Sequence, residues 1–182
     1  MKVAITASDA FVAPYIIDAL GDAAVVIPDE VLEDSMTLDV MLTPCNALIH
    51  INSRPVDTSV ARNDREVKIM MREAARPVLD AVNRHGELHM IIVGTLRVHP
   101  PWSPGDDYYG PESSLSPRDT AAEGQLWIEE NALERAESGR PVSVIRASNV
   151  QGVPLQGPPG NGILHRWAGE SQIGWINVPG SG

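Results

Sequence analysis

The chain of 182 residues is long enough for one domain with a sizeable hydrophobic core. Its net charge of −10 leaves too few cations for a basic surface, which argues against nucleic acid or an anionic membrane as a partner. The single cysteine excludes an internal disulfide and fits a reducing compartment. No apolar stretch approaches the length of a membrane span and no charged leader opens the chain, so we expect a cytoplasmic protein.

The first twenty residues predict a strand, a turn of small residues and a helix. Val3–Ile5 forms the apolar strand, and Ile16, Ile17 and Leu20 recur on one helical face. Pro14 suits the first turn of a helix, so we expect this helix to begin late. A unit of this kind opens a dinucleotide-binding βαβ fold.

Alanines stand where the phosphate-binding turn of that fold needs glycines. Ala7, Ala10 and Ala13 are spaced three residues apart. A methyl group there penalises a positive φ and occupies space that a pyrophosphate would use. We therefore predict that binding of NAD or NADP is weak or lost. Asp9 is expected to cap the helix or to lie in the turn.

The rest of the chain alternates strands and helices, which predicts a doubly wound, mainly parallel α/β sheet. Further strands are expected at residues 23–27, 47–51, 88–93 and 142–146, and helices at residues 62–84 and 120–137. Pro77 is expected to kink or split the first helix. The second has Leu126, Trp127, Ala132 and Leu133 as its expected apolar contacts. Residues 30–42 leave too little room for a full strand and helix, which predicts a trimmed connection.

Two Pro- and Gly-rich stretches, residues 97–117 and 151–162, follow strands at the carboxyl edge of the predicted sheet. Ligands of open α/β sheets bind at this edge, and a long loop there is typical of a functional lid or a disordered segment. We predict two parts: a dinucleotide-binding-like domain at residues 1–150 and a reduced substrate-binding portion at residues 151–182.

Five segments resemble, in order, those of the extended short-chain dehydrogenase/reductases, the NAD-dependent epimerase/dehydratase family. They are KVAITASDAFVAPYIIDAL, NALIHINS, IIVGTLRVHP, SPRDTAAEGQLWIEE and VSVIRASNVQGVP. The resemblance covers nearly the whole chain. It implies a Rossmann-type fold with helices on both faces of the sheet, and a family chemistry that uses NAD or NADP.

The same resemblance exposes departures at the catalytic positions. The family uses a Tyr as acid and base, a Lys four residues later that lowers the pKa of that Tyr, and a Ser or Thr that polarises the substrate oxygen. Thr95 keeps the last position, whereas Arg118 replaces the Tyr and Ala122 replaces the Lys. Arginine stays protonated near neutral pH and cannot shuttle a proton. Tyr108 and Tyr109 in the loop are candidates for the missing acid.

The candidate site consists of residues near the carboxyl ends of the strands and in the turn after the first strand. The catalytic candidates are Thr95, His99, Tyr108 and Arg118; the substrate-binding candidates are Arg97 and Asn149; the cofactor-binding candidates are Ala7, Ala10, Phe11, Val12, Asp29, Asn52 and Ser53. Arg97 and Arg118 either hold a carboxylate or phosphate or form ion pairs within the protein. Asp29 either holds a ribose or is a surface acid. His50 is expected to be a hydrogen-bonded core residue, and no spacing suggests a metal site.

Three functional hypotheses follow. The favoured one is a degenerate epimerase/dehydratase-like protein that uses the old cleft for small-molecule binding or non-redox chemistry. The first alternative is a working NAD(P)-dependent epimerase, dehydratase or reductase that acts on a nucleotide sugar or a small carbonyl compound. The second is a non-catalytic subunit, and a homo-oligomer or a complex with a partner subunit is expected. The joint loss of the glycines and of the Tyr–Lys pair favours the first hypothesis.

Overall fold

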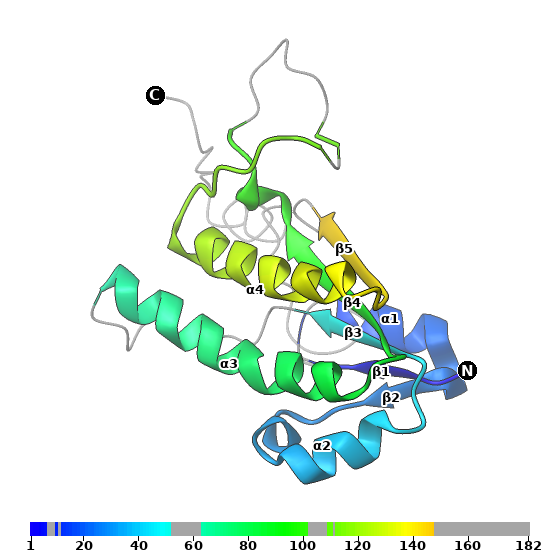
Figure 1. Ribbon diagram of the computed structural model, residues 1–182. Helices are drawn as coiled ribbons and strands as arrows, with labels where there is room; N and C mark the ends of the chain where they lie inside the picture. The colour runs from blue at the N-terminus through cyan, green and yellow to red at the C-terminus, as the bar shows by residue number, and fades with distance from the viewer. Residues whose placement is uncertain (7–9, 11, 52–62, 102–108, 111, 148–182) are drawn as a thin grey trace, which may run out of the picture. The chain divides into compact units, whose positions relative to one another are not determined.

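The computed structural model describes residues 1–6, 10, 12–51, 63–101, 109–110 and 112–147. Its strands are β1 (Val3–Ile5), β2 (Ala24–Val26), β3 (Ala47–Ile51), β4 (His89–Thr95) and β5 (Val142–Ala147). They form one sheet in the order β2-β1-β3-β4-β5, and every neighbouring pair is parallel (Figure 1). The predicted parallel α/β sheet is confirmed. The portion predicted at residues 151–182 lies outside the described residues, so the domain boundary stays a prediction.

The connection between β2 and β3 is trimmed, as predicted. It contains only the 3₁₀ helix Asp29–Glu33 and the helix α2 (Ser35–Leu42). A six-stranded dinucleotide-binding sheet has the order 3-2-1-4-5-6. Deleting its third strand leaves the order seen here, and the chain crosses directly from β2 over β1 to β3.

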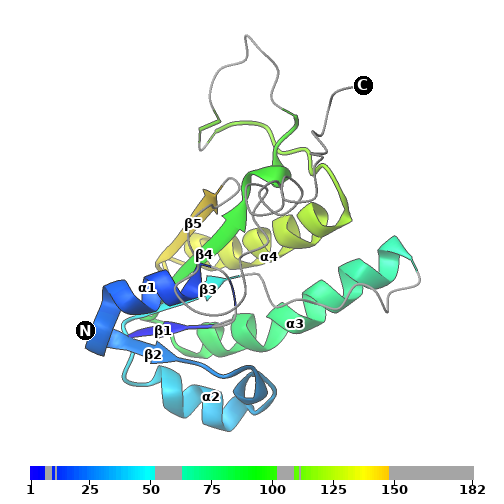
Figure 2. The ribbon, with the colours of Figure 1, turned by 180° about the vertical axis from the view of Figure 1, so that it is seen from behind.

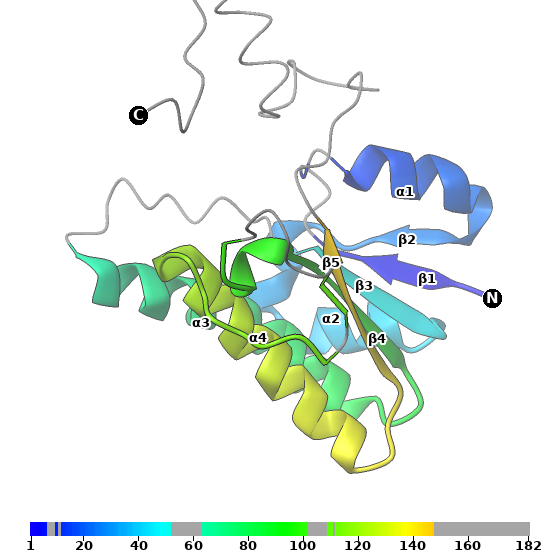
Figure 3. The same cartoon turned by 90° about the horizontal axis from the view of Figure 1, so that it is seen from above.

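The described helices cover the two faces of the sheet unequally. Helix α1 (Ala13–Leu20) lies on one face, whereas α2, α3 (Asp64–Arg84) and α4 (Thr120–Glu137) lie on the other (Figures 2 and 3). Successive residues of a strand point to opposite faces. Leu48, Met90 and Ile92 therefore pack against α2, α3 and α4, whereas Ile5 and Ile51 pack beneath α1.

Helix α1 begins late because of Pro14. Its first residue is Ala13, Pro14 lies in its first turn, and Val12 is the N-cap residue without a side-chain hydrogen bond. Asp9, expected to cap this helix or to lie in the turn, lies outside the described residues. Proline has no N–H to satisfy and its φ is preset for a first turn, so the helix begins around it. Gly21, with a φ of 50°, ends the helix.

Helix α3 runs through Pro77 as one helix, so the expected split does not occur. A proline in a helix interior costs about 3 kcal/mol. The buried face of α3 includes Val78, Leu79 and Val82. Burial of each of these side chains contributes roughly 1.5–3 kcal/mol, and together they exceed the cost of one lost backbone hydrogen bond.

Helix α4 has the predicted bounds, and its predicted apolar contacts are confirmed in part: Ala132 belongs to the core cluster and Trp127 packs against it. Leu133 is 41% exposed, and of the four expected apolar contacts only Ala132 is fully buried. Three polar residues on α4 are buried instead: Gln125, Glu129 and Arg135. Gln125 and Glu129 bond to each other, and Glu129 and Arg135 also bond to other segments of the chain.

Candidate functional site

Thr95 lies at the carboxyl end of β4, as predicted, and its hydroxyl makes a local contact. Oγ1 accepts a hydrogen bond from the backbone N–H of Arg97 at 3.2 Å and so caps the 3₁₀ helix Leu96–Val98. The side chain stands at the edge of the sheet where ligands of open α/β folds bind. Its role in polarising a substrate stays a prediction.

Arg118, at the position of the family's Tyr, ties the segment after β4 to the start of α4. Its Nε donates to the carbonyl of His99 at 3.0 Å and its Nη2 donates to the carbonyl of Pro100 at 2.7 Å. Its backbone N–H donates to the carbonyl of Arg97 at 3.0 Å. Among the described residues, Arg118 thus bonds within the protein to backbone carbonyls. Ala122, at the position of the family's Lys, is 1% exposed.

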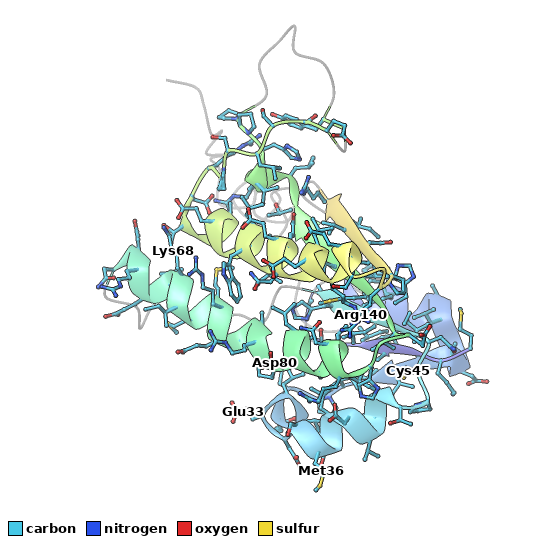
Figure 4. All side chains as sticks on the ribbon, viewed as in Figure 1. Glu33, Met36, Cys45, Lys68, Asp80 and Arg140 are labelled. Atoms are coloured by element: carbon cyan, nitrogen blue, oxygen red, sulfur yellow. The ribbon has the colours of Figure 1, made fainter. Side chains whose placement is uncertain are left out.

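Arg97 forms the internal ion pair that was one of its two predicted roles. Its Nη2 pairs with Oδ2 of Asp119, whose Oδ1 accepts from the backbone N–H of Ala122 at 2.9 Å. Lys68 on α3, labelled in Figure 4, pairs in the same way with Glu123 on α4. These cations are therefore compensated by acids of the protein itself. Exposed pairs of this kind contribute about 0–1 kcal/mol each to stability.

His99 is a buried residue with three neighbours. Its Nδ1 donates to the carbonyl of Ser114 at 3.0 Å, and the ring of Tyr109 stacks on it with centroids 4.6 Å apart. Its Nε2 lies 3.4 Å from Nη1 of Arg146. An arginine N–H can only donate a hydrogen bond, so Nε2 is the acceptor in this contact.

Neither tyrosine of the loop is seen to replace the missing acid. The hydroxyl of Tyr109 donates to the carbonyl of Pro100, and its ring is held against His99. Tyr108 lies outside the described residues. The hydroxyl of Tyr109 is thus engaged with a backbone carbonyl, and the Thr95 hydroxyl with the N–H of Arg97.

A buried polar network behind His99 was not predicted. Glu129 has no exposed surface; its Oε1 accepts from Nε2 of Gln125 at 3.0 Å and its Oε2 accepts from Nε of Arg146 at 2.8 Å. Gly94 on β4 makes room for it. A Cβ at this position would overlap the Glu129 carboxylate and lie 2.6 Å from Nε2 of Gln125. A glycine within a strand of branched residues was the available signal, because it marks a close approach.

His50 is the hydrogen-bonded core residue that the sequence predicts. Its Nδ1 lies 2.8 Å from Oγ1 of Thr6, at the carboxyl ends of β3 and β1. Burial lowers the pKa of His50 to about 4, because a charged imidazole would lose its hydration there. The ring is therefore neutral near pH 7.

The predicted cofactor-binding positions are only partly visible. Ala10 and Ala13 are buried in the cluster beneath α1, Val12 packs against that cluster, and Asp29 is the first residue of the 3₁₀ helix after β2. Four cofactor-binding candidates lie outside the described residues: Ala7, Phe11, Asn52 and Ser53. The substrate-binding candidate Asn149 also lies outside them. No group of metal-binding side chains occurs in the described ranges. No helix there is long and apolar enough to cross a membrane.

The comparisons with known proteins place the fold. No protein-family model matches the chain, and no curated protein matches it. Among solved structures, it is similar to UDP-glucose 4-epimerase from Thermotoga maritima with UDP-glucose, with a TM-score of 0.78, 15% identity, and coverage of 100% of this chain and 67% of that one.

Two further structures show the same likeness. UDP-glucuronic acid 4-epimerase from Bacillus cereus, in complex with UDP-glucuronic acid and NAD, has a TM-score of 0.72 at 18% identity, and 95% of this chain covers 63% of that one. RMD from Pseudomonas aeruginosa, complexed with NADPH, has a TM-score of 0.67 at 17% identity, with coverage of 86% and 57%. The chain therefore spans about six tenths of the length of several solved structures that it matches. These neighbours are extended short-chain dehydrogenase/reductases, and the chain has their Rossmann-type fold.

Proposed function

We propose that this chain binds a small molecule at the carboxyl edge of its sheet, or catalyses a non-redox reaction there, without transferring a hydride. The observation that carries the proposal is the pair of hydrogen bonds from Arg118 to the carbonyls of His99 and Pro100. A guanidinium held in this way is a structural tie and has no proton to exchange near neutral pH.

Two further positions support the proposal. Ala122 offers no charge with which to tune an acid, and its burial leaves no space for a longer side chain without rearrangement. The methyl groups of Ala10 and Ala13 belong to the packed cluster beneath α1, where the fold's glycines give close approach to a pyrophosphate. The altered turn and the altered catalytic positions have one explanation in common, the loss of a nicotinamide cofactor.

The proposed ligand site is the edge formed by the ends of β1, β3 and β4, where Thr95 offers a hydroxyl and Arg97 an exposed guanidinium. The neighbours bind UDP-glucose, UDP-glucuronic acid, NAD or NADPH. For this chain we propose a small molecule other than a nicotinamide dinucleotide. The protein would act in the cytoplasm, as a homo-oligomer or with a partner subunit.

The experiment that tests the proposal identifies what the purified protein carries. The full chain is purified without added ligand and denatured, and the supernatant is analysed by mass spectrometry for dinucleotides and other small molecules. We expect no NAD(H) or NADP(H) above the level of a matched mock purification. A nicotinamide dinucleotide released in a near-stoichiometric amount would overturn the proposal.

A further inference from the structure

A groove on the α4 side of the sheet lies apart from the ends of β1 and β3. It runs between α4, β5 and the segment after β4, and its volume is about 360 Å³. Its lining residues are Leu96, His99, Tyr109, Gly110, Leu133, Val144 and Arg146. We call it the β5 groove. Pockets of about 300 Å³ and above hold small ligands, so this groove has the size of a site for one small molecule.

Arg146 supplies the groove with a fixed donor. Its Nε is bound to Glu129 and its Nη1 points to His99, which together fix the plane of the guanidinium. The side chain is 16% exposed. Among the described residues nothing accepts a hydrogen bond from Nη2, so these residues leave its N–H groups available to a ligand.

The charge of Arg146 is already compensated. Glu129 is fully buried against it, with Oε2 2.8 Å from Nε of Arg146. An anion that entered the groove would lose its hydration and would meet no uncompensated cation. A neutral acceptor such as a carbonyl oxygen has a much smaller desolvation cost and still gains a charge-assisted hydrogen bond.

The remaining walls are apolar. Leu96, Leu133 and Val144 line the groove, and Tyr109 adds an aromatic ring held by its stacking on His99. Apolar walls with a few placed polar groups are the usual composition of a small-molecule site. Leu133 lines the groove from α4 and is 41% exposed, so its side chain stands at the mouth of the groove.

We propose that the β5 groove is a binding site for a small, uncharged, largely apolar molecule that presents a hydrogen-bond acceptor, such as a ketone, to Nη2 of Arg146. This site is separate from the one in the proposed function and does not rest on it. Discovery of a bound dinucleotide at the N-terminal turn would overturn that function and leave the groove untouched.

The probe for the test is 4-fluoroacetophenone, titrated into the full chain and followed by ¹⁹F NMR. Two matched probes change one property each: 1-ethyl-4-fluorobenzene lacks the acceptor, and 4-fluorobenzoate carries a charge. We expect saturable binding of the ketone. A single hydrogen bond to a charged group predicts about tenfold weaker binding of the probe without an acceptor. The charged probe is expected to bind more weakly than the ketone.

Two protein variants locate the binding. Leu133→Trp fills the mouth of the groove from an exposed position and is expected to weaken the ketone at least tenfold, roughly the loss of one well-packed contact. Met36→Trp is the control; Met36 is 71% exposed on α2 and points away from the sheet (Figure 4). The paired substitution Glu129→Gln with Arg146→Met removes the donor without stranding a buried charge, and it should abolish the preference for the ketone over 1-ethyl-4-fluorobenzene.

Three results would each overturn the proposal. The ketone shows no saturable binding to the folded wild-type chain, or it binds equally to wild type and Leu133→Trp. Alternatively, 4-fluorobenzoate binds more tightly than the ketone, which would make the groove an anion site. Far-ultraviolet circular dichroism confirms that each variant is folded, and the paired variant provides a second readout if Leu133→Trp is not.

Discussion

Glu129 and Arg146 form an ion pair whose carboxylate is fully buried, with Arg146 Nε 2.8 Å from Glu129 Oε2. Arg146→Met alone strands the buried carboxylate, and we expect it to lower the free energy of unfolding by about 3–5 kcal/mol. The paired substitution Glu129→Gln with Arg146→Met should recover most of that loss. Urea unfolding of the two single variants and the pair measures the cycle. Additive losses would contradict the ion pair.

Gly94 is predicted to be intolerant of any side chain. A methyl group there would overlap the Glu129 carboxylate and crowd Gln125, both of which are held in the buried network. Gly94→Ala is therefore expected to cost about 1–3 kcal/mol, the usual range for overpacking. Gly86→Ala is the control, since nothing lies within 4 Å of the added atom. Thermal unfolding compares the two; similar shifts of the midpoint would show that Gly94 is not closely packed.

Arg135 is predicted to hold the end of α3 to the start of β4. It is 4% exposed, and it donates to the carbonyls of Val82 at 2.5 Å, His85 at 2.9 Å and Leu88 at 2.6 Å. The carbonyls of Val82 and His85 also accept backbone N–H groups, so Arg135→Met leaves chiefly the carbonyl of Leu88 without its donor. We expect the free energy of unfolding to fall by about 1–3 kcal/mol, the range for one unsatisfied buried group.

The matched control for Arg135 is Arg140→Met. Arg140, labelled in Figure 4, makes one exposed hydrogen bond, to the carbonyl of Asn83 at 2.9 Å. Its replacement is expected to cost less than about 1 kcal/mol. Guanidinium unfolding of both variants measures the difference. Equal losses would mean that Arg135 does not serve as the tie.

His50 predicts a loss of stability in mild acid. Its pKa is about 4 in the folded chain and about 6.5 when unfolded, so between these values the unfolded state binds the extra proton. Stability should therefore be unaffected above pH 6.5, fall as the pH drops towards 4, and lose on the order of 3 kcal/mol in total.

Carboxylates such as Asp39 affect the stability at lower pH than His50 does. Hydrogen bonding from Arg84 lowers the pKa of Asp39, so its contribution is lost only as the pH falls below its ordinary value of 3.8. Urea unfolding of wild type and His50→Asn from pH 7 to pH 4 separates the two effects. The variant should be less stable near pH 7 and show a flatter dependence in this range. Parallel curves would contradict a buried, titrating His50.

Elements with strong local signals were predicted well. The bounds of β3 agree with its apolar run, and those of α4 agree because Asp119 caps its start and Gly139, with a φ of 77°, follows its end. The interior of α3 was harder. A proline disfavours a helix interior, so the local sequence around Pro77 predicts a break in the helix. Only the packing of α3 on the sheet shows that the helix tolerates it.

The site was predictable only at the level of residue type. The replacement of a Tyr by Arg118 is visible in the sequence, but the carbonyls that it binds belong to a segment nineteen and eighteen residues earlier. The network of Gln125, Glu129 and Arg146 was missed because an acid on a predicted helix is ordinarily a surface residue. Its partner lies seventeen residues away on the next strand, and only the fold brings them together.

The most direct test of the proposed loss of hydride transfer is a titration of the purified full chain with NADH and NADPH, followed by nicotinamide fluorescence. The comparison protein is the variant Ala7→Gly with Ala10→Gly, which restores two of the turn's glycines. The methyl groups that alanine places in this turn predict no saturable binding to the wild-type chain below the millimolar range and tighter binding to the variant. Micromolar binding of either cofactor to the wild-type chain would contradict the proposal.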